Sequence, residues 1–140
     1  MIEEVILFQI DKTSKVAKQY SQREFDRLGL EITVEQWILL KIVHESNDIS
    51  QKELAEKSLR DPASITRTLD LLQKKELINR LPIPENRRQY SIDLSKKGVV
   101  FIKTNMPLVD AHRKKSIEGL SEKEQRNLNE LLKRIQENMS

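Results

Sequence analysis

Residues 61–74, DPASITRTLDLLQK, carry side chains suited to hydrogen bonding with a polyanion. Apolar residues recur at i, i+4 and i+7 from Ile65, and this spacing predicts a helix with one buried face. On a helical wheel of about 100° per residue, Arg67 and Lys74 then lie opposite that face. Arginine offers five donors in a planar fork, a geometry that fits a phosphate or the edge of a guanine.

The first turn of this predicted helix contains small and hydroxylated residues. Ala63, Ser64 and Thr66 would let the N-terminus of the helix approach a phosphate or a base edge closely. The alternative is an ordinary amphipathic helix with a solvated polar face, in which Asp70 pairs with Lys74 one turn later. This helix follows a short capped helix and a tight turn, and it precedes a basic hairpin. The sequence therefore favours a helix that contacts a polyanion over one whose polar face is only solvated.

The basic hairpin is predicted from two short strands, over residues 77–82 and 88–94. In the second strand apolar and polar residues alternate, as in a half-buried strand, and the connection PIPENR is rich in turn formers. Arg87 and Arg88 then lie at the tip, where a narrow loop can enter a minor groove whose negative potential attracts arginine. A solvated basic turn is the alternative. Arg80, on the first strand, is expected to contact phosphate or to be exposed.

Capping motifs predict where the other helices begin. TVEQ, SQKE and SEKE are capping boxes, in which a hydroxyl accepts from a free backbone N–H and the third residue beyond it reaches back. Asp-Pro is a favourable N-cap followed by a tolerated proline. The expected helices are one over residues 3–28, bent near 11–14, and others that begin at Thr33, Ser50, Asp61, Ser95 and Ser121.

Length and composition limit the class of protein. A chain of 140 residues, with 34% charged and 37% hydrophobic residues, fits one soluble, helix-rich domain. The absence of cysteine excludes disulfides and thiolate metal sites, and two isolated histidines make a metal site unexpected. The acidic N-terminus differs from a signal peptide, and no apolar run approaches the roughly 20 residues of a membrane span, so we expect a cytoplasmic location without membrane contact.

Charge is concentrated in the central segment. Residues 60–88 contain seven basic and four acidic residues, an excess equal to the net charge of +3 of the whole chain. A basic surface of this kind favours a polyanionic partner.

The central block resembles the winged helix-turn-helix of MarR-type transcription regulators. The resemblance rests on SQKELAEKSLRDPASITRTLDLLQKKELINR followed by ENRRQYSIDLSKKG, notably D-x-x-S-I-T-R, the two arginines and L-S-x-K-G. It implies a mainly α fold with a small β-hairpin wing (α+β) in a single domain of residues 1–140. Residues 30–98 would form the DNA-binding part, and residues 1–29 and 99–140 the helical dimerisation part.

The resemblance also implies a function. A homodimer would bind a pseudo-palindromic operator in double-stranded DNA, with the fourth helix in the major groove and the wing in the minor groove. The family usually represses transcription, and many members release DNA when a small-molecule effector binds. The residues expected to contact DNA are Ala63, Ser64, Thr66, Arg67 and Lys74 in the helix and Arg80, Asn86, Arg87 and Arg88 in the wing.

Two residues depart from the family pattern. Glu76 replaces the glycine that commonly ends the recognition helix, and a left-handed conformation there costs a non-glycine residue roughly 1 kcal/mol, so a different helix end is one expectation. Asn86 replaces the acid that usually precedes the wing arginines, which removes a charge-assisted hydrogen bond.

An effector pocket is expected where the terminal helices meet the second helix. Candidate lining residues are Tyr20, Trp37, His44 and His112, each of which has core packing or a surface position as an alternative. Without cysteine, peroxide sensing through a thiol is excluded.

Two other classes of function were weighed. A winged-helix module that binds only protein is the alternative, but it would need apolar residues on the face that carries Arg67 and Lys74. An enzyme is not expected, because the sequence contains no nucleophile–base set and no glycine-rich phosphate loop. No cofactor is expected either.

Overall fold

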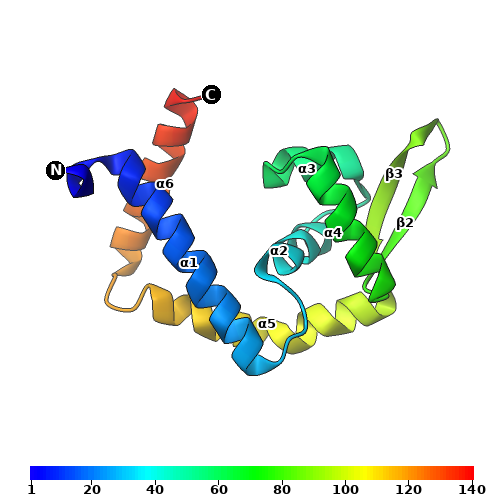
Figure 1. Ribbon diagram of the computed structural model, residues 1–140, viewed down its shortest axis with the longest axis horizontal. Coiled ribbons are helices and arrows are strands. Elements are labelled where there is room, and N and C mark those ends of the chain that lie inside the picture. Colours follow the sequence, from blue (N-terminus) through cyan, green and yellow to red (C-terminus); the bar gives the residue numbers. More distant parts are fainter. The chain divides into compact units, whose positions relative to one another are not determined.

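The computed structural model describes residues 1–140, apart from the side chain of Arg87 (Figure 1). The chain forms two compact units, residues 1–106 and residues 107–140. In chain order the elements are η1 (Ile2–Glu4), α1 (Ile6–Leu28), α2 (Val34–His44), β1 (Ile49–Ser50), α3 (Gln51–Ser58), α4 (Pro62–Lys74), β2 (Ile78–Ile83), β3 (Asn86–Leu94), α5 (Lys96–Ser116) and α6 (Glu122–Asn138).

The predicted N-caps are confirmed. The side chains of Thr33, Ser50, Asp61 and Ser121 each accept a hydrogen bond from the backbone N–H three residues later. Both hydrogen bonds of the capping box form at Thr33 and Ser121. At Ser50 the hydroxyl cap forms, but the reciprocal bond from Glu53 that the SQKE sequence predicts does not. Helix α1 is continuous through residues 11–14, where a bend was predicted, and a 3-10 turn lies before α1.

The sheet has the strand order β1-β3-β2 with antiparallel pairing. Strand β1 was not predicted: Ile49 pairs with Ile92, so two residues between α2 and α3 extend the base of the hairpin. Strands β2 and β3 form the projecting hairpin in Figure 1, each with bounds within two residues of the prediction. The predicted fold class, mainly helical with a small β-hairpin wing, is confirmed.

The core of the first unit lies under the helix-turn-helix. Trp37 of α2 is 1% exposed and packs edge-on against Phe25 of α1, with ring centroids 6.1 Å apart. Phe101 of α5 contacts the same indole at 6.2 Å. Aromatic contacts of this kind add to the free energy that burial alone contributes. The predicted buried face of α4, Ile65, Leu69 and Leu72, is 0% exposed at all three positions.

The second unit contains the end of α5 and all of α6. In α6, Leu128 and Leu131 are 49% and 52% exposed, although the sequence places them on the apolar face. Among the residues that the structure describes, no helix has the length and apolar character needed to cross a membrane.

Candidate nucleic-acid interface

Helix α4 is held so that one polar face points outward. Asp61 Oδ1 accepts a 2.9 Å hydrogen bond from the backbone N–H of Ser64, and Pro62 begins the helix where a missing N–H costs little. The opposite face is fully buried. Ala63, Thr66, Arg67 and Lys74 are therefore exposed together, as their spacing predicts.

A hydrogen-bonded tie fixes the start of α4 against α3. Thr66 Oγ1 accepts from Gln51 Nε2 at 2.9 Å and donates to the carbonyl of Pro62 at 3.0 Å. This hydroxyl already has partners, so it offers a ligand only its remaining acceptor capacity. Figure 1 shows α3 and α4 as neighbouring helices. The hydrogen bond joins the first residue of α3 to the second turn of α4.

Arg60 is a structural residue that sequence reasoning missed. Its Nη2 donates to Ser64 Oγ at 2.5 Å and to Thr68 Oγ1 at 2.9 Å. Ser64 is half-buried as a result, and it is less available to DNA than the prediction implies. In the sequence, Arg60 is followed four and eight residues later by Ser64 and Thr68. These two hydroxyl residues lie one turn apart on the same face of α4, and this spacing could have indicated the contact.

The end of α4 is left-handed despite the missing glycine. Glu76 has a φ of 61°, and its N–H donates to the carbonyl of Gln73 at 2.9 Å. The N–H of Leu77 donates to the carbonyl of Leu72 at 3.0 Å, and both leucine side chains are buried. This pattern is a Schellman motif. The expectation that Glu76 gives α4 a different end is therefore wrong. The left-handed end that glycine usually forms is kept, and Glu76 adopts it at a cost in backbone strain.

The L-S-x-K-G sequence clamps this helix end. Ser95 Oγ caps α5 by accepting from the N–H of Gly98 at 2.9 Å, and it donates to the carbonyl of Glu76 at 2.6 Å. Lys97 Nζ donates to the carbonyl of Lys75 at 3.0 Å. Free carbonyls at the C-terminus of α4 thus receive donors from the start of α5.

Arg80 joins the base of the wing to α4. Its Nη2 donates to Asp70 Oδ1 at 2.5 Å and to Gln73 Oε1 at 2.6 Å, and its Nε donates to the same glutamine oxygen at 2.9 Å. The predicted pairing of Asp70 with Lys74 is replaced by this ion pair, because the arginine fork reaches two turns of α4 at once. The Arg80 side chain is 17% exposed, so the expected exposed position is wrong.

The tip of the wing is irregular. Pro82 pairs with Tyr90 and Ile83 pairs with Asn86, so three residues of β3, 87–89, lie between consecutive pairs. Asn86 Oδ1 accepts from the backbone N–H of Arg88 at 3.1 Å. The asparagine therefore braces the backbone of the tip, and the Arg88 side chain is exposed. The predicted role of Arg87 concerns a side chain outside the described part of the structure.

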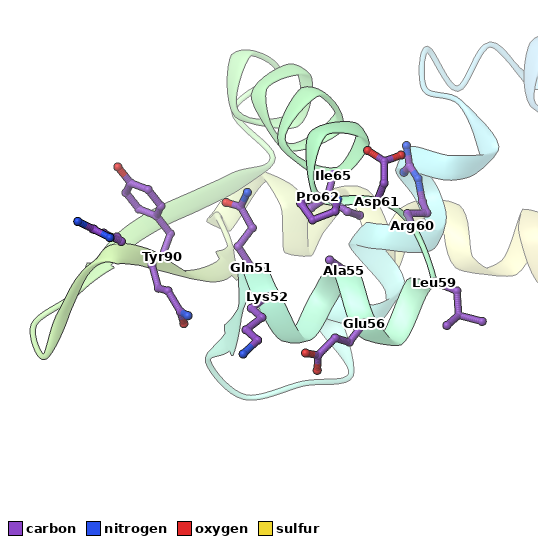
Figure 2. Close-up of a pocket in the computed structure, with 12 residues that line it drawn as sticks. Gln51, Lys52, Ala55, Glu56, Leu59, Arg60, Asp61, Pro62, Ile65 and Tyr90 are labelled. Atoms are coloured by element: carbon purple, nitrogen blue, oxygen red, sulfur yellow. The ribbon is translucent and has the colours of Figure 1, made fainter. Parts of the chain in front are cut away.

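A pocket of about 770 Å³ lies beside the helix-turn-helix. Figure 2 shows residues of α3, the α3–α4 turn and β3 around it, with Gln51 and Tyr90 on one side and Arg60 and Asp61 on the other. Arg88 of the wing also lines it. The pocket therefore opens between the start of the recognition helix and the wing.

The four residues predicted for an effector pocket occupy different environments. Trp37 is buried among aromatic rings, His44 is exposed at the end of α2 and Tyr20 is half-buried in α1. His112 is 8% exposed and belongs to the second unit. The pocket beside α3 and α4 is lined by none of them.

The fold and this outward-facing helix define a winged helix-turn-helix protein. Residues 32–90 match the model of the MarR family. This match covers less than half of the chain, which is similar over these residues to the MarR family of transcriptional regulators.

A curated relative is similar over about half of the chain. The chain is 38% identical over 72 residues to an uncharacterised HTH-type transcriptional regulator, YhbI, from Bacillus subtilis (strain 168). The match covers 51% of this chain and about half, 47%, of the length of that relative.

Solved structures share the fold over nearly the whole chain. A MarR/EmrR family transcriptional regulator from Acinetobacter sp. ADP1 is 21% identical, with a TM-score of 0.90 that covers 99% of this chain and 97% of that one. The MepR–DNA complex of S. aureus gives 20% identity and a TM-score of 0.83, covering 96% and 98%.

Proposed function

We propose that this protein is a sequence-specific, double-stranded DNA-binding regulator of transcription. The observation that carries the proposal is the outward face of α4, where Ala63, Thr66, Arg67 and Lys74 are exposed together while both helix ends are fixed by hydrogen bonds. A preorganised helix of this kind can place an arginine against base edges without first paying to order it. The fold shared with a protein solved in complex with DNA supports the same proposal.

The residues have distinct proposed roles. Arg67, one turn into α4, reads base edges in the major groove, while Lys74 contacts phosphate. Ala63 lets DNA approach the start of the helix closely. Thr66 and Ser64 offer hydroxyl oxygens to DNA, and hydrogen bonds from Gln51 and Arg60 already hold these oxygens in place. In the wing, Arg88 enters the minor groove together with Arg87, and Asn86 shapes the turn.

We further propose that a homodimer binds a pseudo-palindromic operator. One recognition helix makes few contacts, and a second copy spaced by one helical turn adds its own. The proposed dimerisation part comprises residues 1–29 and 99–140. The exposed leucines of α6 support this assignment, because apolar side chains on one helix face are suited to cover by a second chain. We also propose that the protein represses transcription and that a small-molecule effector relieves this repression, as is typical of the family. A cytoplasmic location belongs to the same proposal.

Selection of binding sites from a random duplex pool tests the proposal. We expect a palindromic consensus, and binding that weakens steeply between 50 and 200 mM salt, because phosphate contacts release counterions. Arg67→Glu should abolish binding to the consensus. Lys57→Glu, a reversal of the same sign at an exposed residue of α3 outside the proposed DNA contacts and the proposed dimerisation part, should not. Failure to enrich any sequence at low salt would contradict the proposal.

A protein-binding module without DNA contact remains the second candidate. Its partner should still bind after Arg67→Glu, whereas DNA would not. The exposed residues of α4 favour DNA, since they carry positive charge where an apolar contact would be needed. We also propose that the chain acts without catalysing a reaction.

A further inference from the structure

We propose that Arg80 is a positioning residue, which neutralises Asp70 on the DNA-facing surface of α4 and does not itself contact DNA. The inference rests on the proposed function and assigns to Arg80 a role different from the phosphate contact that its sequence position suggests. It follows from one arrangement of side chains, in which an acidic residue occupies the surface that must approach a polyanion.

Asp70 lies within the recognition face. It is one turn beyond Thr66 and one turn before Lys74, and its side chain is 53% exposed. Unpaired, its carboxylate would face the phosphates together with the two basic residues and would oppose their attraction. A residue at this position is therefore harmful to DNA binding unless its charge is compensated.

The compensation comes from the base of the wing. Arg80 Nη2 donates to Asp70 Oδ1 at 2.5 Å, and Gln73 Oε1 accepts from both Nη2 and Nε of the same guanidinium. These hydrogen bonds hold the guanidinium against α4 and occupy its Nε and Nη2 donors. Since the Arg80 side chain is only 17% exposed, it has little surface left for a phosphate.

The backbone position of Arg80 makes the arrangement rigid. Arg80 lies in the middle of β2 and pairs across the strand with Ile92, which is 0% exposed. The guanidinium is thus anchored in the regular part of the hairpin, below the irregular tip. A charge-assisted hydrogen bond from such an anchor is stronger than one made by a mobile surface side chain.

The two roles of Arg80 predict different results for a double substitution. Affinity for the selected duplex would be measured for the wild type, Arg80→Ala, Asp70→Asn and the double variant. Masking predicts that Arg80→Ala weakens binding about tenfold, the scale of one exposed unit charge against nearby phosphates. Asp70→Asn alone should bind at least as tightly as wild type, and the double variant should recover to within about threefold of it.

The salt dependence separates masking from contact. A direct phosphate contact would lower the slope of log K against log salt by about one per chain in Arg80→Ala, whereas masking leaves the slope nearly unchanged. A double variant as weak as Arg80→Ala, a reduced slope, or Arg80→Ala binding as tightly as wild type would each overturn the inference. Wild-type protein that binds no duplex would instead overturn the proposed function.

Folding is controlled within the same set. Urea midpoints of the four proteins separate a loss of stability from a loss of affinity, because Arg80→Ala removes three hydrogen bonds from a side chain that is 17% exposed. If Arg80→Ala unfolds more easily, Arg80→Gln replaces it, since glutamine keeps an apolar stem along α4 but carries no charge. The same recovery by Asp70→Asn is expected, and its absence counts against masking.

Discussion

Gly98 shows how closely two backbones approach at the end of the recognition helix. A Cβ built at this position would lie 2.0 Å from the carbonyl oxygen of Leu77, a backbone atom that also accepts from the N–H of Ser95 at 3.1 Å. The glycine of L-S-x-K-G is therefore needed for space. It lets the start of α5 press against the Schellman turn that ends α4.

We expect Gly98→Ala to destabilise the protein by about 1–3 kcal/mol, the usual cost of forcing extra atoms into a packed site. Urea unfolding measures the change. Lys96→Ala, at the exposed first position of the same helix, is the matched control and should leave the midpoint nearly unchanged. Equal midpoints for the two variants would show that the helices separate more easily than the structure implies.

Glu76 is a second residue with a measurable cost. Because its φ of 61° is left-handed, Glu76→Gly should stabilise the protein by about 1 kcal/mol in urea unfolding. Its contact with Lys97, at 3.9 Å between exposed groups, is worth little. Glu76→Ala keeps the strain and loses only the carboxylate, so a gain from alanine as large as from glycine would point to charge rather than conformation.

At the scale of elements, the helix-turn-helix is a pair of helices locked at their N-termini. The Asp61 cap, the Arg60 hydrogen bonds and the Gln51–Thr66 contact all act within the first two turns of α4. The end of α4 that bears Ala63 and Arg67 is therefore held most firmly. This is the end expected to reach the bases.

Loss of the cap should loosen this end of α4 selectively. Asp61→Ala is expected to lower stability by about 1 kcal/mol and to speed amide exchange at Ser64, whose N–H would lose its acceptor. Asp61→Asn retains an acceptor and serves as the control. Unchanged exchange at Ser64 in the alanine variant would contradict the role of the cap.

The cap of α6 makes a prediction about pH. Hydrogen bonds from the backbone N–H and side chain of Ser121 lower the pKa of Glu124 below its ordinary value. A lowered folded-state pKa means that the bond stabilises α6 above the ordinary pKa of glutamate and is lost as pH falls through the folded value. Titration by carboxyl NMR should show this depression, and Ser121→Ala should reduce it.

At the scale of the whole molecule, DNA affinity is expected to depend on basic side chains outside α4, such as Arg88 of the wing, as well as on α4. Arg88→Gln should weaken binding to all sequences alike and lower the salt slope by about one per bound chain, because a wing contact to the minor groove neutralises phosphates. Lys57→Gln, at an exposed residue of α3 outside the proposed DNA contacts and the proposed dimerisation part, is the control. A loss confined to one operator base would instead assign Arg88 to base readout.

Local signals explain which parts of the fold were predictable. Caps such as Thr33 and Asp61 act on a backbone N–H three residues away, so a short window of sequence contains both partners. The buried stripe of α4 likewise depends only on helical spacing. Helix bounds and the hairpin were therefore predicted well.

Non-local pairings explain what was missed. Strand β1 is two residues long and forms only because Ile92 lies opposite Ile49, which no local pattern reveals. Arg80 was expected at the surface because its partners, Asp70 and Gln73, lie on another element. The exposed residues of α4 could be chosen from helical spacing. Which of its side chains already hydrogen-bond to the rest of the protein could not.

The irregular pairing in β3 separates the tip of the wing from its base. Residues 78–82 keep one uninterrupted register with residues 90–94, while the two-residue turn at 84–85 closes beyond a three-residue loop-out. Residues can therefore be added or removed at 87–89 without turning any side chain of the base to the opposite face. The length of the wing tip can therefore change while the base of the hairpin keeps its register and Arg80 keeps its contact with α4.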